Sequence, residues 1–190
     1  MKTKEVALVI TFAAVTIALD PVRVPYVLLP GVYFRFCEIP MVIAFILFGA
    51  RIGIAIAALN VIAEIILFPG PIVFIGRPMV FLLVLCMFLG MYLAQKIFKL
   101  RNLHQSFAKT SGYYTIFGTA FRAAVAPVLN FALYRYAIPF FTGTIFTDTM
   151  VLAMVPSFII YAIIFALYTI PIGCLIAKAV SKNLNIKPRY

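Results

Sequence analysis

Polar side chains interrupt the long apolar runs of this 190-residue chain at a few positions, and their types and spacing could do chemistry. Asn60 and Glu64 lie four residues apart in NVIAE, so a helix would place both side chains on one face, one turn apart. This pair could bind a polar ligand. It could equally form a polar clamp between helices, with Glu64 snorkelling or paired to a nearby arginine.

A second group lies in the stretch FRAAVAPVLN, which contains Arg122 and Asn130. Arg122 is too deep in its apolar run to reach water easily, so we expect it to pair with a carboxylate or to face a partner protein. Asn130 is nearer the other end of the run and is the better ligand candidate. A buried asparagine that hydrogen-bonds its neighbours is at least as common.

The stretch YFRFCEIP places Arg35 and Glu38 just before a long apolar run. With Arg77, these residues are expected to line the rim of a membrane-embedded pocket. The loops VRVPYVLLPGVYFRFCEIP and FPGPIVFIGR are rich in proline, glycine and aromatic residues, so we expect them to fold over the helices as a lid. Their rings could stack on a flat ligand or could form an interfacial aromatic belt. These rings are Tyr26, Tyr33, Phe34 and Phe74.

Enzymatic motifs are missing from the sequence. It contains no HExxH, GxSxG or GxxxxGK[ST] pattern, and its single histidine, His104, lies in a basic loop. The three cysteines show no metal-ligand spacing and are expected to be packing residues. We therefore expect no enzyme, no metal and no cofactor, and any ATP-driven work must come from another chain.

The elements that must position these residues are transmembrane helices. Hydrophobic residues make up 65% of the chain, charged residues make up 11%, and the mean hydropathy is +1.14, which is typical of an integral membrane protein. We predict an all-α fold, with six transmembrane helices in a single bundle and one domain over residues 1–190. The spans are predicted near 5–21, 39–49, 52–68, 77–98, 112–137 and 149–180.

The lysines predict the orientation of the bundle. All of them fall on one side of the six predicted spans, so the positive-inside rule makes both termini cytoplasmic and the protein a multi-pass protein of the cell membrane. The formal net charge of +11 is therefore a feature of topology and does not indicate nucleic-acid binding. The lysines are Lys2, Lys4, Lys96, Lys99, Lys109, Lys178, Lys182 and Lys187.

A family resemblance adds to these inferences. AAVTIALD places Ala14 and Ala18 at small-xxx-small spacing, and FRFCEIPMVIAFILFGARIGIAIAALNVIAEII resembles the S components, the membrane-embedded substrate-binding subunits, of energy-coupling factor (ECF) vitamin transporters. CEIPMVIAFILFGARIG and the stretch around Asn130 are most similar to the riboflavin-binding branch. The chain departs from that branch at Gly49-Ala50, where Gly-Pro is common, and in VPSFIIYA, which lacks an Asn and a Lys.

The resemblance implies a high-affinity vitamin-binding subunit of an ABC importer. It would bind riboflavin as the transported ligand from the outer face. It would work with a transmembrane coupling subunit, which would contact Ala14 and Ala18, and with two ATPases. An S component for biotin, thiamine, folate or a similar vitamin stays open, as do a self-contained small secondary transporter or channel and a membrane enzyme acting on lipid. The expected ligand-binding residues are Asn60, Glu64, Asn130, Glu38, Arg35, Tyr33, Phe34, Arg77 and Phe74.

Overall fold

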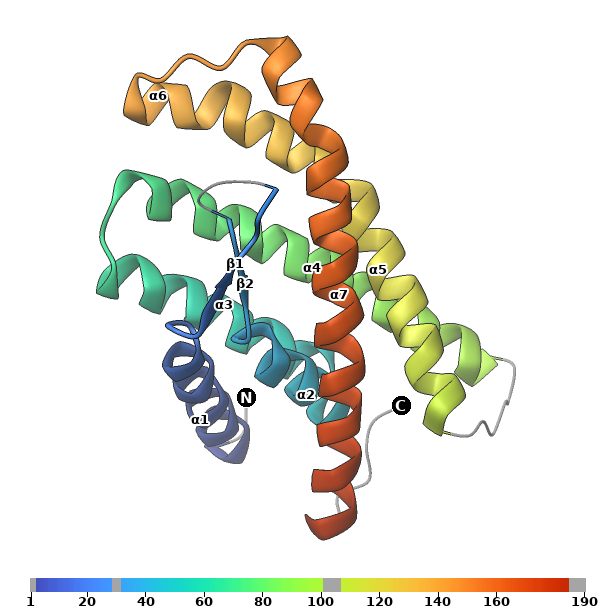
Figure 1. Ribbon diagram of the computed structural model, residues 1–190. Coiled ribbons are helices and arrows are strands. Elements are labelled where there is room, and N and C mark those ends of the chain that lie inside the picture. The colour runs from blue at the N-terminus through green and yellow to red at the C-terminus, as the bar shows by residue number, and fades with distance from the viewer. Residues whose placement is uncertain (1–2, 29–31, 101–106, 185–190) are drawn as a thin grey trace.

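The computed structural model describes residues 3–28, 32–100 and 107–184. Over these residues the chain forms a bundle of six helical segments with one small β-hairpin (Figure 1). The predicted all-α membrane bundle is thus confirmed. The helices are α1 (Thr3–Leu19), α2 (Glu38–Phe48), α3 (Ala50–Leu67), α4 (Pro71–Leu100), α5 (Phe107–Ala132) and α7 (Asp148–Leu184); α5 continues through a π-helical turn, η1 (Leu133–Ala137), into α6 (Ile138–Thr142).

Four of these helical segments are long and apolar enough to cross a membrane, which makes the chain a multi-pass membrane protein. They are Ala50–Leu67, Val73–Ile97, Phe107–Thr142 and Asp148–Asn183. Helix α2 is different because its 11 residues span about 16 Å, well short of the hydrocarbon core of about 30 Å. Ten of those residues are buried, so α2 is surrounded by the other helices of the bundle.

Close helix contacts build the core around α2. Phe45 of α2 stacks on Phe88 of α4, with ring centroids 4.7 Å apart. On the α7 side, a Cβ added to Gly173 would lie 2.6 Å from Val42, so the missing side chain allows α7 to approach α2 closely. Helices α4 and α5 meet at Gly90 in the same way. Small residues at these crossings let the backbones approach within the membrane.

The chain also forms a β-hairpin of β1 (Arg23–Pro25) and β2 (Tyr33–Arg35), which was not predicted from the sequence. The two strands are antiparallel, with Arg23 opposite Arg35 and Val24 opposite Phe34. Successive side chains of a strand point to opposite faces. Tyr33 and Arg35 therefore share one face of β2, and Phe34 lies on the other face.

The boundary of α4 corrects a second expectation. The predicted loop FPGPIVFIGR is largely helical, because α4 begins at Pro71 and not near residue 77. Proline suits the first position of a helix, where the backbone N–H that it lacks would have no partner. As a result, Phe74 and Arg77 lie on the first turns of a helix and not on a loop.

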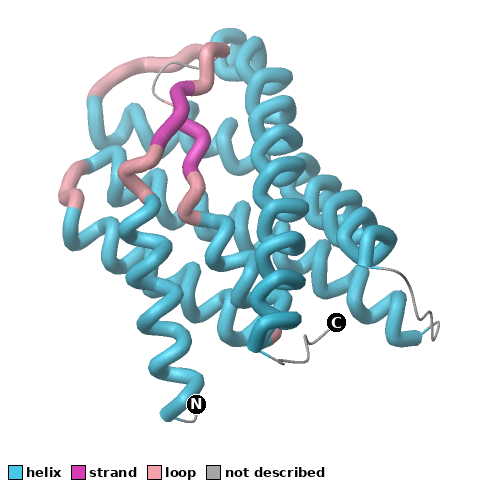
Figure 2. Tube along the Cα trace, turned by 60° about the horizontal axis from the view of Figure 1, so that its bottom comes forward, coloured by secondary structure: helices cyan, strands magenta, loops and turns pink. Residues whose placement is uncertain are grey.

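The first and last helices have their outer ends on one side of the bundle. The N-terminal end of α1 and the C-terminal end of α7 lie at the same end of the bundle in both views (Figures 1 and 2). The hairpin rises from the far end of α1 toward the opposite end, where α6 lies. We call this second end the hairpin end.

Candidate functional site

A buried carboxylate organises the hairpin end of the bundle. Asp20, directly after α1, is fully buried, and it accepts hydrogen bonds from three arginines. The Arg23 Nη2 lies 2.6 Å from its Oδ2, the Arg35 Nη1 lies 3.4 Å from its Oδ1, and the Arg77 Nη2 lies 3.4 Å from its Oδ2. A buried carboxylate needs such partners, because an unpaired charge away from water is costly. Asp20 therefore holds the end of α1, the hairpin and α4 together.

Asn60 and Glu64 share one face of α3, as their spacing predicts. The Asn60 Nδ2 donates to the Glu64 Oε1 at 2.8 Å, and the Glu64 Oε2 pairs with the Arg77 Nη1. Arg77 thus bridges Asp20 and Glu64, which supports the polar clamp between helices. The Asn60 Oδ1 is buried without a hydrogen-bond partner among the described residues, so this side chain retains capacity for a further partner.

Two cavities share Arg77 as a lining residue. The first, which we call the arginine-lined cavity, has a volume of about 290 Å³, and the second, the inner cavity, has a volume of about 20 Å³. A volume of 20 Å³ accommodates a water molecule but not a vitamin. The arginine-lined cavity is formed by Arg23, Tyr33, Arg35, Phe68, Val73, Gly76 and Arg77. The inner cavity is formed by Cys37, Glu38, Met41, Ala57, Asn60, Val61, Glu64, Arg77, Val80, Phe81 and Val84.

The predicted ligand residues are therefore divided among several places. Tyr33, Arg35 and Arg77 come together at the arginine-lined cavity, and Glu38, Asn60 and Glu64 surround the inner cavity. Arg23 and Phe68 also line the arginine-lined cavity, although neither was predicted from the sequence as a ligand-binding residue. The available signal for Arg23 was its position three residues after Asp20, which is the spacing of the ion pair that they form.

Three predicted ligand residues line neither of these two cavities. Phe34 packs against α7, and Phe74 is 58% exposed. The Asn130 Nδ2 donates to the carbonyl oxygen of Ala126 at 2.8 Å, within its own helix. Their roles as ligand contacts stay predictions.

Glu38 does not lie at a rim. It is 2% exposed, and its two oxygens accept from the Arg122 Nη1 at 2.5 Å and the Arg122 Nη2 at 3.0 Å. The Arg122 guanidinium lies over the ring of Phe165, 4.3 Å from its centroid. The prediction that Arg122 pairs with a carboxylate is confirmed. The rim position of Glu38 is wrong because the helix that it begins, α2, is enclosed by the bundle.

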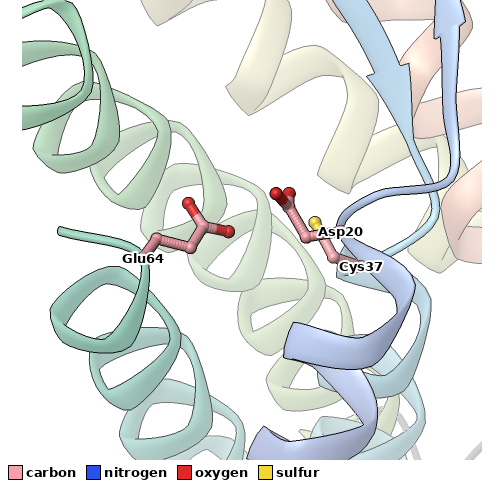
Figure 3. A group of neighbouring side chains, drawn as sticks. All are labelled: Asp20, Cys37 and Glu64. Carbon is pink, nitrogen blue, oxygen red and sulfur yellow. The ribbon is translucent and has the colours of Figure 1, made fainter. Parts of the chain in front are cut away.

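Asp20, Cys37 and Glu64 bring three potential metal ligands within 4.8 Å of one another (Figure 3). The surrounding charges do not suit a cation, because three arginine guanidiniums already pair with the two carboxylates. Burial, together with the nearby carboxylates, raises the pKa of the Cys37 thiol well above its usual value. A protonated thiol is a poor metal ligand. The cluster is therefore better described as a network of ion pairs.

Tyrosine hydroxyls fasten the hairpin to α7. Tyr161 donates to the carbonyl oxygen of Tyr33 at 2.9 Å, and Tyr168 donates to the carbonyl oxygen of Arg35 at 2.8 Å. The ring of Phe34 stacks on Tyr161, with centroids 5.0 Å apart. The first predicted loop thus folds onto the bundle as expected, and α7 fixes the backbone that carries Arg35.

The two alanines of α1 are available to another helix. Ala14 and Ala18 are both exposed, one turn apart, whereas Val9, Ala13 and Thr16 face the bundle. A stripe of small residues on an exposed helix face allows close helix approach in a membrane.

Comparisons with known proteins show a clear likeness to a solved structure. No protein-family model matches the chain, and no curated protein matches it. Among solved structures, the chain is similar to the S component of a bacterial ECF transporter, with a TM-score of 0.71 and 21% sequence identity. The match covers 97% of this chain and 99% of the other. The chain therefore has the fold of that S component over nearly its whole length.

Proposed function

We propose that this chain is the substrate-binding S component of an ECF-type importer and is not itself an enzyme. The observation that carries this proposal is the fold, which matches a solved S component across almost the full length of both chains. The resemblance of the sequence to the same family supports it. The arginine-lined cavity is polar and aromatic, and the hairpin contributes to its lining; a ligand would enter there.

The substrate under this proposal is a vitamin, and riboflavin is the first candidate. The sequence around α2 and around Asn130 supports riboflavin. Tyr33 and Phe68 in the arginine-lined cavity offer ring faces to a planar ligand. Biotin, thiamine and folate are the alternatives that a binding panel has to include.

The partners under this proposal are a transmembrane coupling subunit and two ATPases in the cell membrane. The exposed stripe of Ala14 and Ala18 supports a helix contact with the coupling subunit. The ATPases supply the energy, because the chain has no phosphate-binding loop motif of its own.

The decisive experiment is co-purification with the energising module together with vitamin binding. The tagged chain is expressed with the coupling subunit and ATPases of the same organism, and retention of the module is measured. The double variant Ala14→Leu/Ala18→Leu should lose the module and keep vitamin binding. Ala120→Leu/Ala124→Leu is the matched control, since these alanines are also exposed and four residues apart, on α5.

The outcomes separate the levels of the proposal. Protein purified in mild detergent that is yellow, or that quenches riboflavin fluorescence stoichiometrically, supports riboflavin. Colourless protein that binds another vitamin of the panel replaces riboflavin and keeps the S component. If the chain binds no vitamin and never retains the module, the proposal is wrong.

A further inference from the structure

Positive charge is in excess around the arginine-lined cavity. Three guanidiniums, those of Arg23, Arg35 and Arg77, line it. The carboxylates of Asp20 and Glu64 pair with these guanidiniums, and both carboxylates are buried. At least one positive charge is therefore left without a negative partner among these five groups.

The hairpin register concentrates this charge at a cost. Arg23 and Arg35 are directly opposite each other in the β1–β2 pair, and like charges at opposite positions destabilise a strand pair. The carboxylate of Asp20 offsets part of that repulsion by accepting from both arginines. A second anion between the two guanidiniums would offset the rest.

The three arginines also have more N–H donors than the carboxylate of Asp20 can accept from. Each guanidinium carries five N–H donors in a fixed fork that matches a carboxylate or a phosphate. Asp20 offers two oxygens to three arginines, and two of these contacts are as long as 3.4 Å. The side chains of Arg23 and Arg35 remain 34% and 21% exposed beside the cavity. Their remaining donors can reach a ligand there.

From these observations we infer that the arginine-lined cavity binds the anionic group of a small molecule, a carboxylate or a phosphate, between Arg23 and Arg35, with Arg77 at its base. The volume of about 290 Å³ suits such a group with a short apolar portion against Tyr33 and Phe68. The anion site rests on this geometry, whereas its assignment to the transported ligand rests on the proposed function. Under that assignment the ligand is an anionic vitamin, such as biotin or folate among the alternatives above, or a phosphorylated one. Riboflavin carries no anionic group, so anion binding here would favour these alternatives over riboflavin.

The anion could come from a water-borne solute or from a lipid headgroup, since both present the same chemistry. The test uses the full chain in nanodiscs of phosphatidylcholine. Thermal unfolding is followed by tyrosine fluorescence in inorganic phosphate, in acetate and in chloride at equal ionic strength. A ligand that binds the folded state raises the Tm in a saturable way.

Two kinds of variant test the site from opposite directions. Arg23→Gln removes one guanidinium but leaves Arg35 and Arg77 to pair with Asp20, so the fold should survive. Arg135→Gln is the matched control, because Arg135 is also 34% exposed and pairs with an aspartate, Asp148, away from the cavity. Gly76→Glu adds a tethered carboxylate where a side chain would meet nothing within 4 Å, and Gly76→Gln is its neutral control.

We expect phosphate or acetate to raise the Tm of the wild type above its value in chloride. Arg23→Gln should raise the half-saturating concentration by about tenfold or more, and Gly76→Glu should abolish the shift, while both controls retain it. If phosphate or acetate still raises the Tm in phosphatidylglycerol discs, the ligand is a water-borne anion. If the Tm in those discs is already raised in chloride, and phosphate and acetate raise it no further, the ligand is a lipid headgroup.

The inference is overturned if the Tm in phosphate and in acetate equals that in chloride at every concentration. An unchanged shift in Arg23→Gln also overturns it. Neither result affects retention of the energising module, so failure of the anion site and failure of the proposed function are distinguishable. Loss of module binding, in turn, leaves the anion-dependent Tm as it was.

Discussion

Buried ion pairs join residues that are far apart in this sequence. Glu38 and Arg122 are separated by 84 positions, and Asp20 and Arg77 by 57. Once one member of such a pair is buried, the other is required, because a lone buried charge costs several kcal/mol. The pairs therefore specify which segments meet.

Arg122→Met should destabilise the protein strongly, since it leaves the Glu38 carboxylate buried without its bidentate partner. We expect a loss of about 3–5 kcal/mol in the free energy of unfolding. The double variant Arg122→Met/Glu38→Leu should recover most of that loss because both charges are removed. Thermal unfolding in mild detergent measures all three proteins.

The exposed pair Arg135–Asp148 provides the control for this experiment. Asp148 is 63% exposed, so Arg135→Met should cost about 1 kcal/mol or less. If Arg122→Met and Arg135→Met unfold at the same temperature, the buried Glu38–Arg122 pair stabilises the fold no more than the exposed Arg135–Asp148 pair does.

Cys37 should resist alkylation in the folded protein. Burial raises the pKa of its thiol, with Glu38 and Asp20 adding to the effect, so raising the pH from about 7 to about 9, through the ordinary thiol range, should produce little thiolate. Maleimide labelling followed by peptide mass spectrometry measures the rate. Labelling should become fast in SDS, and rapid labelling of native protein at neutral pH would contradict the buried position.

At the scale of the helices, close crossings depend on particular glycines. A Cβ on Gly90 would lie 2.4 Å from the carbonyl oxygen of Phe117, so Gly90→Ala must push α4 and α5 apart. We expect a cost of about 1–3 kcal/mol. Gly112→Ala, in an open part of α5, is the control and should be neutral or stabilising by up to about 1 kcal/mol. Equal Tm values for Gly90→Ala and Gly112→Ala would show that α4 and α5 do not cross closely at Gly90.

At the scale of the whole molecule, the N-terminal end of α1 and the C-terminal end of α7 define one side of the bundle. Among the described lysines, Lys4 lies at the start of α1, Lys96 and Lys99 near the end of α4, Lys109 near the start of α5, and Lys178 and Lys182 near the end of α7. By the positive-inside rule we predict that this end of the bundle is cytoplasmic. A fluorescent protein fused after Tyr190 should therefore fold and fluoresce. Alkaline phosphatase inserted after Thr144, in the exposed segment before α7, should be active outside.

The opposite pattern, with an active phosphatase at the C-terminus and an inactive one after Thr144, would reverse the orientation. It would also place the arginine-lined cavity on the cytoplasmic side, and the proposed direction of ligand binding would fail with it.

The sequence by itself determined the features that depend on local pattern. Run length and hydropathy were sufficient for the membrane bundle, because about 20 apolar residues are needed to cross the bilayer as a helix. The four-residue spacing was sufficient to bring Asn60 and Glu64 together on α3, because helix geometry fixes that contact.

Only the tertiary structure decided which charges meet and which side chains line a cavity. Glu38 was expected at a rim, but α2 is enclosed by the bundle, so its first residue meets Arg122 in the interior. Arg23 and Arg35 face each other because the hairpin register aligns them, and Arg77 reaches both Asp20 and Glu64 because α4 begins early, at Pro71. These contacts join segments distant in the chain, and their geometry comes from helix packing, which local periodicity does not encode.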